Sequence, residues 1–499
     1  MQENTNKAIV FNSIIMNGRM LLNTILALFT TRFALQSLGV TDYGLFSVLG
    51  SIISFISVFN TIMLSTCNRF LAVAVGHGDI KEINKSFNVN LIIFIGCALM
   101  LLFIGLPIGD WYIRHYINYD GPLQNALMVF YFTIIGSVVS TIATPFNGLL
   151  MAKERFLLVS IVDVVAHVIR FLGVVALLFF FENKLLVYTI LQTLTVALPT
   201  FVVWIYCKIE FADYVRITTI RDKNAYKEVF KFSGWVSIGA ISSVVRSQAA
   251  ALIVNNFFNT VMNTALGIAN SLNQYVMLFA NNVTQPMQPQ ITKSYATGNF
   301  ERTNELLVMS TKFSFLMMLL IGSPFFVSAD WLLSLWLGQV PPYAVAFTIL
   351  LIIDNLVMSF NSGLSLLLFA DGRIALYQIV INALRLASVV AGYFVLRTIA
   401  EPKYLFYTYI LFSVFIVIAT QWVLYKTLYY NNKTLIMKSY IPSLLVLVLF
   451  LPTLMLPVSV HPIIRIIIAM CYLLVLEFFI GLSKKERFFI VNKIKRNTV

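Results

Sequence analysis

The stretch NVNLIIFIGCALMLLFIGLPIG, residues 88–109, contains no charged residue and decides the class of fold. A helix of about 20 mostly apolar residues is long enough to cross the hydrocarbon core of a bilayer. Working outward, comparable stretches occur at residues 10–36, 43–67, 123–148, 157–181, 185–207, 233–256, 263–288, 306–328, 344–369, 374–396, 404–426, 439–458 and 463–482. The sequence therefore predicts an all-α polytopic membrane protein with about fourteen transmembrane helices.

The composition agrees with this class. Hydrophobic residues make up 59% of the chain and charged residues only 11%, whereas soluble proteins average about 25% charged residues. The mean hydropathy of +0.85 implies more apolar surface than a soluble core can bury. A net charge of +14 would suggest a nucleic-acid partner in a soluble protein. Here the basic residues lie mostly in short loops on one side of the membrane, so no nucleic-acid partner is expected.

The placement of lysine and arginine predicts the orientation. An even number of spans puts both termini on one side, and that side collects Lys81, Lys153, Arg155 and the basic segments 208–231 and 484–496. The opposite side holds only Arg114, Lys184, Arg397 and Lys403. Because positive loops stay on the cytoplasmic side, both termini are expected in the cytoplasm.

A weak internal repeat divides the chain. Residues 78–84 resemble 298–304, residues 151–155 resemble 369–373, and residues 40–42 resemble 261–263, all at an offset of about 220 residues. The predicted organisation is an N-terminal six-helix lobe at 1–210, a basic cytoplasmic linker at 211–232, a C-terminal six-helix lobe at 233–430, and two extra helices with a basic tail at 431–499. Transporters built from such parallel repeats place their substrate path between the halves.

Several motifs of enzymes are absent from the sequence. It contains no phosphate-cradling G-x-x-x-x-G-K-[ST] motif and no HExxH. The external loops are short, which argues against a glycan polymerase or ligase, because such enzymes usually build their site on a large external loop or domain. The cysteines (Cys67, Cys97, Cys207 and Cys471) show no paired spacing and are interpreted as small buried hydrophobic residues. We therefore expect a transporter without catalytic residues, metal or cofactor.

Arginines inside the predicted spans are the most informative residues. Arg170, Arg246 and Arg385 each lie about 16–21 Å from the start of their helix, near the middle of the bilayer. Each would cost about 2.5–3.5 kcal/mol if it faced lipid, so they are expected to face a watery cavity or partners inside the protein. Arg19 is shallower, and the sequence leaves open whether it lines the cavity or reaches the interface. Since the arginine fork suits carboxylates and phosphates, a cavity lined by these four arginines predicts an anionic substrate.

Two carboxylates and one histidine accompany these arginines. Asp163, His167 and Arg170 follow one another at i, i+4 and i+7, on one face of a helix. Asp354 lies in a span of the second half. Both acids are interpreted as neutralising nearby arginines, with proton coupling as the alternative. Pro286 and Pro289, near the end of their span, are candidate gating kinks or, equally, static packing kinks.

The stretch from Arg32 to Gly44, RFALQSLGVTDYG, resembles the signature of polysaccharide transporters at their first external loop. Its end, Asp42-Tyr43-Gly44, is interpreted as a tight turn that uses the glycine. Residues 78–79 and 151–155 are also similar to this family, the O-antigen and capsule repeat-unit flippases of the multidrug/oligosaccharidyl-lipid/polysaccharide exporter superfamily. The resemblance implies a lipopolysaccharide or capsule pathway in the bacterial inner membrane. It implies alternating-access export of an undecaprenyl-pyrophosphate-linked oligosaccharide through a basic cavity.

The expected partners follow from this resemblance. They are the lipid-linked anionic oligosaccharide, the bilayer, H⁺ or Na⁺ as a coupling ion, and other membrane proteins of glycan assembly. Three alternatives remain open at this point: a flippase for the peptidoglycan lipid precursor, a multidrug or cation antiporter, and a membrane glycan polymerase or ligase.

Overall fold

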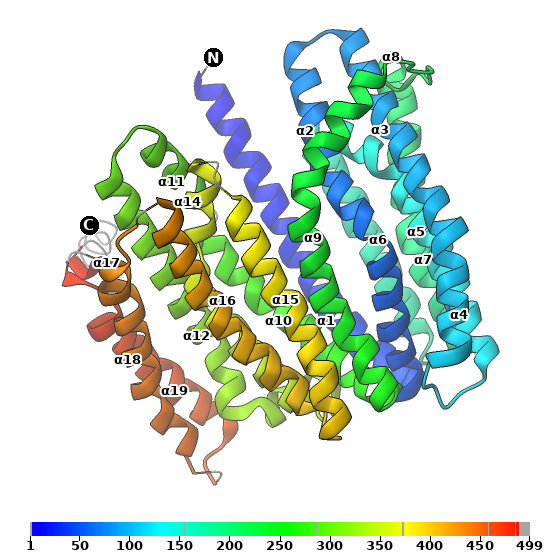
Figure 1. Ribbon diagram of the computed structural model, residues 1–499. Helices are drawn as coiled ribbons and strands as arrows, with labels where there is room; N and C mark the ends of the chain where they lie inside the picture. Colours follow the sequence, from blue (N-terminus) through cyan, green and yellow to red (C-terminus); the bar gives the residue numbers. More distant parts are fainter. Residues whose placement is uncertain are drawn as a thin grey trace. The chain divides into compact units, whose positions relative to one another are not determined.

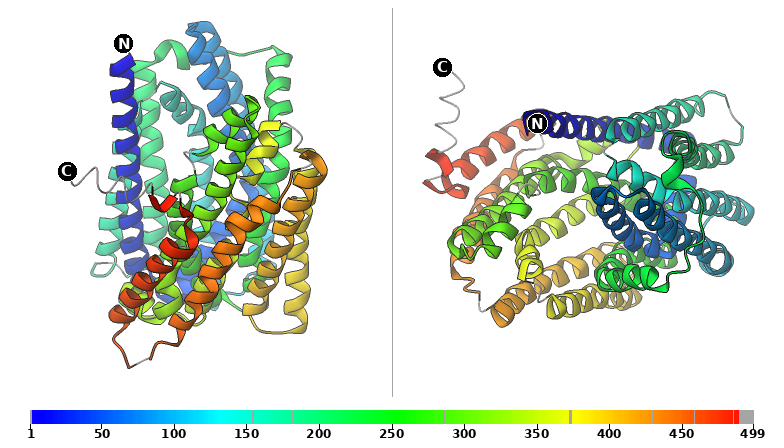
Figure 2. Two further views of the ribbon diagram at one scale, coloured as in Figure 1. Left: turned by 90° about the vertical axis from the view of Figure 1, so that its left-hand side faces the viewer. Right: turned by 90° about the horizontal axis from the view of Figure 1, so that it is seen from above.

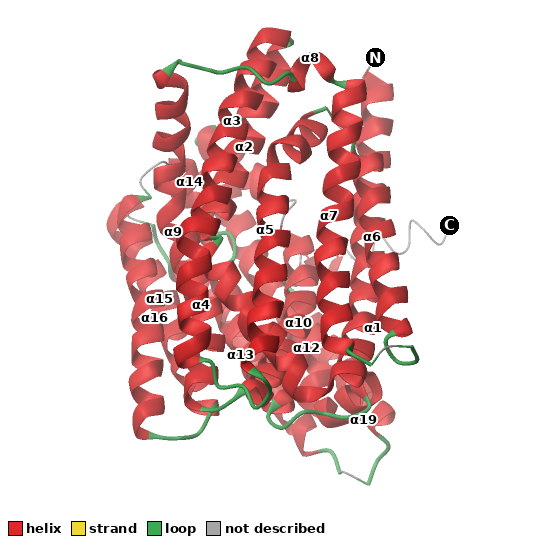
Figure 3. Ribbon diagram, turned by 90° about the vertical axis from the view of Figure 1, so that its right-hand side faces the viewer, coloured by secondary structure: helices red, strands yellow, loops and turns green. Residues whose placement is uncertain are grey.

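The computed structural model describes residues 2–153, 155–180, 182–284, 287–371, 374–428, 430–457, 459–484 and 486–488. Within these ranges the chain forms helices, turns and loops, without strands (Figure 3). Eleven of the described helices are long and apolar enough to cross a membrane. The prediction of an all-α polytopic membrane protein is confirmed. The predicted count of fourteen spans is compatible with these helices and stays a prediction.

The chain divides into two compact units, Met1–Thr264 and Ala265–Val499. The first contains α1 (Gln2–Ile56), α2 (Val58–His77), α3 (Ile80–Met100), the π-helical turn η1 (Leu101–Gly105), α4 (Leu106–Tyr116), α5 (Leu123–Ala152), α6 (Phe156–Ala176), α7 (Lys184–Glu210), α8 (Ala212–Val215), α9 (Lys223–Phe257) and the start of α10 (Thr260–Thr284) (Figure 1). Helix α9 packs against α1 and α2. The boundaries of the lobes predicted at 1–210 and 233–430 stay a prediction.

The second unit continues α10 and ends with two adjacent helices, α18 and α19 (Figure 2). Its further elements are α11 (Met287–Ala296), α12 (Phe300–Leu337), α13 (Ala344–Met358), η2 (Ser359–Asn361), α14 (Leu364–Asp371), α15 (Ala375–Thr398), α16 (Lys403–Leu428), α17 (Lys433–Leu435), η3 (Ile436–Tyr440), α18 (Ile441–Phe450), η4 (Leu451–Met455), α19 (Pro462–Leu476) and η5 (Glu477–Gly481). Helix α12 is the most buried of the candidate spans, with 72% of its most apolar window buried.

The corner after the first predicted span depends on Gly39. Its φ of 76° and ψ of 176° interrupt the helical path of α1, and glycine adopts this backbone conformation without steric cost. Gly44 is helical instead, and a Cβ at that position would lie 1.8 Å from the carbonyl oxygen of Thr260. The interpretation of Asp42-Tyr43-Gly44 as a glycine turn is therefore wrong: Gly39 makes the turn, and Gly44 permits close packing. Asp42 accepts a hydrogen bond of 2.6 Å from the Tyr119 hydroxyl.

The segment after α8, part of the predicted linker 211–232, is hydrogen-bonded to side chains of α3. The Asn84 amide donates to the carbonyl oxygen of Arg216 at 2.8 Å, and the Asn88 amide donates to the same oxygen at 2.9 Å. The Thr218 backbone N–H donates to the Asn88 side-chain oxygen at 3.0 Å, and the Thr218 hydroxyl donates to the Asn84 side-chain oxygen at 3.0 Å. The loop that crosses beside α3 in Figure 3 is this segment.

Helix α13 does not continue directly into α14. Gly363, with a φ of 83°, follows η2 at the break. Backbone groups freed inside a membrane need partners within the protein. The Tyr440 hydroxyl donates to the carbonyl oxygen of Phe360 at 2.9 Å, and the Thr311 hydroxyl donates to that of Ser362 at 3.0 Å. Side chains from two other elements thus satisfy two backbone carbonyl groups at this break, which falls inside the predicted span 344–369.

Candidate functional site

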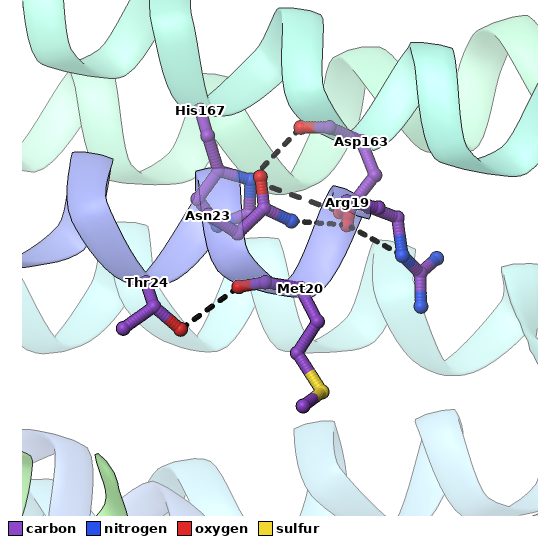
Figure 4. Close-up of polar contacts among 6 residues, drawn as sticks. All are labelled: Arg19, Met20, Asn23, Thr24, Asp163 and His167. Carbon is purple, nitrogen blue, oxygen red and sulfur yellow. Dashed lines mark hydrogen bonds and ion pairs between the residues drawn. The ribbon is translucent and has the colours of Figure 1, made fainter. Parts of the chain in front are cut away.

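Arg19 of α1 and Asp163 of α6 meet across two packed helices (Figure 4). The Arg19 Nε lies 3.8 Å from the Asp163 Oδ2, and the two side chains are 22% and 36% exposed. Asn23, one turn further along α1, donates to the same carboxylate oxygen at 2.7 Å. The question that the sequence left open for Arg19 is thus answered in part: its guanidinium is paired with an acid inside the protein.

His167 lies on the other side of the same carboxylate. Its Nδ1 is 3.7 Å from the Asp163 Oδ1 and 2.8 Å from the Asp163 carbonyl oxygen. Figure 4 shows Arg19, Asn23 and His167 converging on Asp163. The Asp163 carboxylate thus faces both His167 and Arg19. The geometry is compatible with both roles that the sequence allowed for Asp163.

Arg170 lies one helical turn beyond His167 on α6. Its Nε is buried and has no hydrogen-bond partner among the described residues. Asp163 was interpreted as neutralising a nearby arginine, and the arginine that the structure pairs with it is Arg19. Arg170 is therefore the cation of this helix for which the described part of the chain supplies no counter-charge.

Arg246, Arg385 and Asp354 lie on other helices. Arg246 is on α9 and is partly buried. Arg385, on α15 in the second unit, donates to the Asn382 side chain at 3.4 Å. Asp354, on α13, accepts a hydrogen bond of 2.5 Å from Ser413 of α16. A cavity shared by all four arginines stays a prediction.

Of the two candidate gating prolines, the structure describes only Pro289. Pro286 lies outside the described residues, and Pro289 is in the first turn of α11. Helix α10 ends at Thr284 and α11 begins at Met287. The gating role stays a prediction.

Lys312 is a buried cation that the sequence analysis missed. It lies within the predicted span 306–328, its side chain is 3% exposed, and its Nζ is 2.5 Å from the Glu486 carboxylate. Burial raises the pKa of Glu486, but hydrogen bonds from Lys312 and from the Ser483 backbone outweigh it and hold that pKa below its ordinary value. Lys312 could have been found as a charge inside a span, whereas its partner, 174 residues away, could not.

None of the described residues form a group of three or more histidine, cysteine or acidic side chains that could hold a metal ion. All four cysteines are free. Cys67 and Cys207 are buried as expected, but Cys97 is partly buried and Cys471 is exposed, so the interpretation as buried residues is wrong for Cys471.

These features define an all-helical polytopic membrane protein. No protein-family model matches the chain. A multidrug resistance MATE family transporter of the MOP superfamily, in its inward-facing conformation, superposes with a TM-score of 0.68 at 12% identity, covering 82% of this chain and 97% of that one. The lipid II flippase MurJ, in an inward closed conformation, superposes with a TM-score of 0.67 at 12% identity, covering 94% of this chain and 98% of that one.

A sequence relative adds one further similarity. The membrane protein EpsK of Bacillus subtilis (strain 168) is 24% identical over 330 residues, which are 64% of this chain. The match spans 63% of the length of that relative. At these identities the comparisons show the fold, and the resemblance to the polysaccharide flippases within the superfamily stays a prediction.

Proposed function

We propose that this chain is a transporter that flips an undecaprenyl-pyrophosphate-linked oligosaccharide across the cytoplasmic membrane by alternating access. The observation that carries the proposal is Arg170, a guanidinium deep in a predicted span whose Nε is buried and without a partner among the described residues. A partly buried arginine inside a membrane span is costly without a counter-charge, unless water or an anion reaches it. A pyrophosphate offers such an anion, and arginine can bind two of its oxygens at once.

The length of the fold favours a lipid flippase over a multidrug exporter. The MATE transporter covers 82% of this chain, whereas the lipid II flippase covers 94%. The additional coverage supports the proposal of two helices beyond the two six-helix lobes. The proposed extra helices are α18 and α19, which pack against each other and against α12. The second candidate, a flippase for the peptidoglycan lipid precursor, has the same support from the fold.

The charge of the site distinguishes an anionic from a cationic substrate. On α1 and α6, Asp163 already contacts Arg19 and His167, so no acid among these residues is left to bind a cationic drug. Arg170, Arg246 and Arg385 are the proposed contacts for the pyrophosphate and for acidic sugars. Asp163 and His167 are the proposed place for H⁺ coupling.

The test is transport of a fluorescent pyrophosphate-linked oligosaccharide into liposomes that contain the purified full-length protein. Arg170→Gln is expected to lower the initial rate about tenfold or more, because a charge-assisted hydrogen bond contributes about 1.5–3 kcal/mol. Arg302→Gln is the matched control, since Arg302 is about half exposed and pairs with Glu305 at 3.1 Å. Equal rates for wild type and Arg170→Gln, with both proteins correctly inserted, would contradict the proposal.

A deletion strain separates the candidate substrates. Loss of surface glycan with accumulation of its lipid-linked intermediate supports the polysaccharide substrate. Rescue of a strain depleted of its peptidoglycan-precursor flippase supports the second candidate. Dye resistance conferred by the wild-type chain, without either phenotype, would support a multidrug exporter instead.

A further inference from the structure

A groove lies where α16 passes into α17 and η3, in the second unit. Its volume is about 640 Å³, and it is lined by Tyr425, Tyr430, Asn431, Asn432, Lys433, Ile436 and Met437. Tyr425 is 62% exposed and Met437 58% exposed. The groove is therefore open to its surroundings and combines amide, phenol, ammonium and apolar groups.

The charge around this groove is positive. Lys433 lines it, Lys426 lies next to the lining Tyr425 on α16, and Lys438 is exposed on η3. The sequence contains no Asp or Glu between Pro402 and Leu476, so no acid on the same helices offsets these lysines. The hydroxyl of Tyr430, which lines the groove, donates to the Asn304 side chain at the start of α12. The acid next to Asn304, Glu305, already pairs with Arg302. The groove thus favours an anion.

Apolar surface continues from the groove along α18. Ile436 and Met437 line the groove, and Ile441, Leu444 and Val448 follow at helical spacing with exposures of 45%, 46% and 57%. Trp422 is 47% exposed, and the Lys426 Nζ lies 4.9 Å from the centroid of its ring. Exposed tryptophan and tyrosine beside lysine are typical of the head-group level of a membrane. A ligand with a phosphate head and acyl chains fits this sequence of surfaces better than a free anion.

The wall of the groove is hydrogen-bonded to the break between α13 and α14. The side chain of Asn432 donates to the Gln421 carbonyl oxygen at 3.0 Å. The Gln421 amide donates to the Tyr440 hydroxyl at 2.5 Å, and that hydroxyl donates to the Phe360 carbonyl oxygen at 2.9 Å. A residue that lines the groove is thus linked through two side chains to the backbone of η2.

The break itself is incompletely satisfied. Both polar side-chain atoms of Asn361 are buried and lack hydrogen-bond partners among the described residues. Unpaired buried amides cost about 1–3 kcal/mol each, so the conformation of the break depends on the contacts that hold its neighbours. The Tyr440 hydroxyl is one of those contacts.

We propose that this groove binds the phosphate-bearing head group of an anionic membrane lipid, and that its occupancy stabilises the break between α13 and α14 through Asn432, Gln421 and Tyr440. Lys433 and Lys426 contact the phosphate, and the acyl chains lie along α18. The lipid is a regulator bound at this groove, whatever substrate the chain carries. By the charge of the loops, the head group comes from the cytoplasmic leaflet.

The binding test uses the purified full-length chain and native mass spectrometry with added phosphatidylglycerol or phosphatidylcholine. Lys426→Gln/Lys433→Gln is expected to weaken the tightest phosphatidylglycerol binding about tenfold, with phosphatidylcholine unchanged. Lys184→Gln/Lys403→Gln is the matched control, because it also removes two lysines, and these begin α7 and α16 and do not line the groove. Equal affinity of wild type and the groove variant for phosphatidylglycerol overturns the proposal. Equal affinity of the wild type for both lipids also overturns it, as does full competition by inorganic phosphate alone.

The coupling to the break has a separate test. In bilayer nanodiscs, phosphatidylglycerol is expected to slow hydrogen exchange of the amides at 359–363 in the wild type. Tyr440→Phe is expected to retain lipid binding and to lose this protection, because it removes only the hydroxyl that links η3 to η2. Unchanged exchange in the wild type, or full protection in Tyr440→Phe, contradicts the coupling. Neither result depends on transport, so failure here is distinguishable from failure of the proposed function.

Discussion

Gly44 provides the sharpest test of how the first corner is built, because the structure gives it no room for a side chain. A Cβ there would lie 1.8 Å from the Thr260 carbonyl oxygen and 2.6 Å from the Thr264 Oγ1. Close carbon–oxygen contacts in helix packing are about 3.3 Å or longer. The obstructing oxygen belongs to the backbone and cannot turn aside. Gly44→Ala therefore forces α1 away from the start of α10.

The cost follows from the contacts that this displacement breaks. Overpacking of a tight interface costs about 1–3 kcal/mol. The hydrogen bond from the Thr264 hydroxyl to the Val40 carbonyl oxygen spans the same contact, and its loss adds about 1 kcal/mol. We expect Gly44→Ala to lower the free energy of unfolding by about 2–4 kcal/mol.

Gly50, on the same helix, is the matched control because a Cβ there meets nothing within 4 Å. Replacing a helical glycine with alanine in open space stabilises by about 0.5–1 kcal/mol, so the two substitutions are expected to differ in sign. The assay is equilibrium unfolding in mixed micelles, supported by the melting midpoint in detergent. If Gly44→Ala is as stable as Gly50→Ala, the close approach at Gly44 is refuted.

Three further predictions concern the Lys312–Glu486 ion pair and the segment after α8 that is hydrogen-bonded to α3. Lys312→Met is expected to destabilise the protein by about 3 kcal/mol, the lower end of the range for breaking a buried ion pair. The lower end applies because Glu486 is 16% exposed and can turn toward water. The double variant Lys312→Met/Glu486→Gln should recover most of the lost stability in the same unfolding assay. Since its folded pKa is lowered, Glu486 contributes stability above its ordinary pKa of 4.5; this contribution should fade as pH falls through the lowered value, and melting midpoints of wild type and the double variant should converge there. Asn84→Ala/Asn88→Ala should accelerate proteolysis between residues 211 and 222 by freeing the segment from α3, whereas Asn183→Ala should leave that cleavage unchanged.

The sequence predicts the spanning helices well because apolar length is a local property. Residues 88–109 fall on α3, η1 and α4, and the stretch needs no knowledge of its neighbours to be recognised. The break in the span 344–369 was missed although Ser362-Gly363 offered a local signal for it. Gly44 was misread because a glycine that turns and a glycine that packs closely look the same in sequence.

The contacts of the candidate site could be predicted only in part. Depth along a helix identified Arg170 as embedded, and helical spacing placed Asp163 and His167 on its face. The partner of Asp163 could not be found this way, since Arg19 lies on another helix and the pairing depends on how α1 and α6 pack. The same limit hid the contact of Lys312 with Glu486.

The pairing of Asp163 with Arg19 decides the sign of charge that α6 presents to a substrate. If Asp163 neutralised Arg170, the helix would offer little to an anion. In the structure the Asp163 carboxylate instead accepts a hydrogen bond of 2.7 Å from the Asn23 amide and lies 3.8 Å from the Arg19 Nε. The carboxylate of α6 thus pairs with an arginine of α1, and it lies about two helical turns from Arg170. A neutral ligand would leave the Arg170 cation uncompensated in the described part of the chain, so the arrangement favours a ligand that carries negative charge into the membrane.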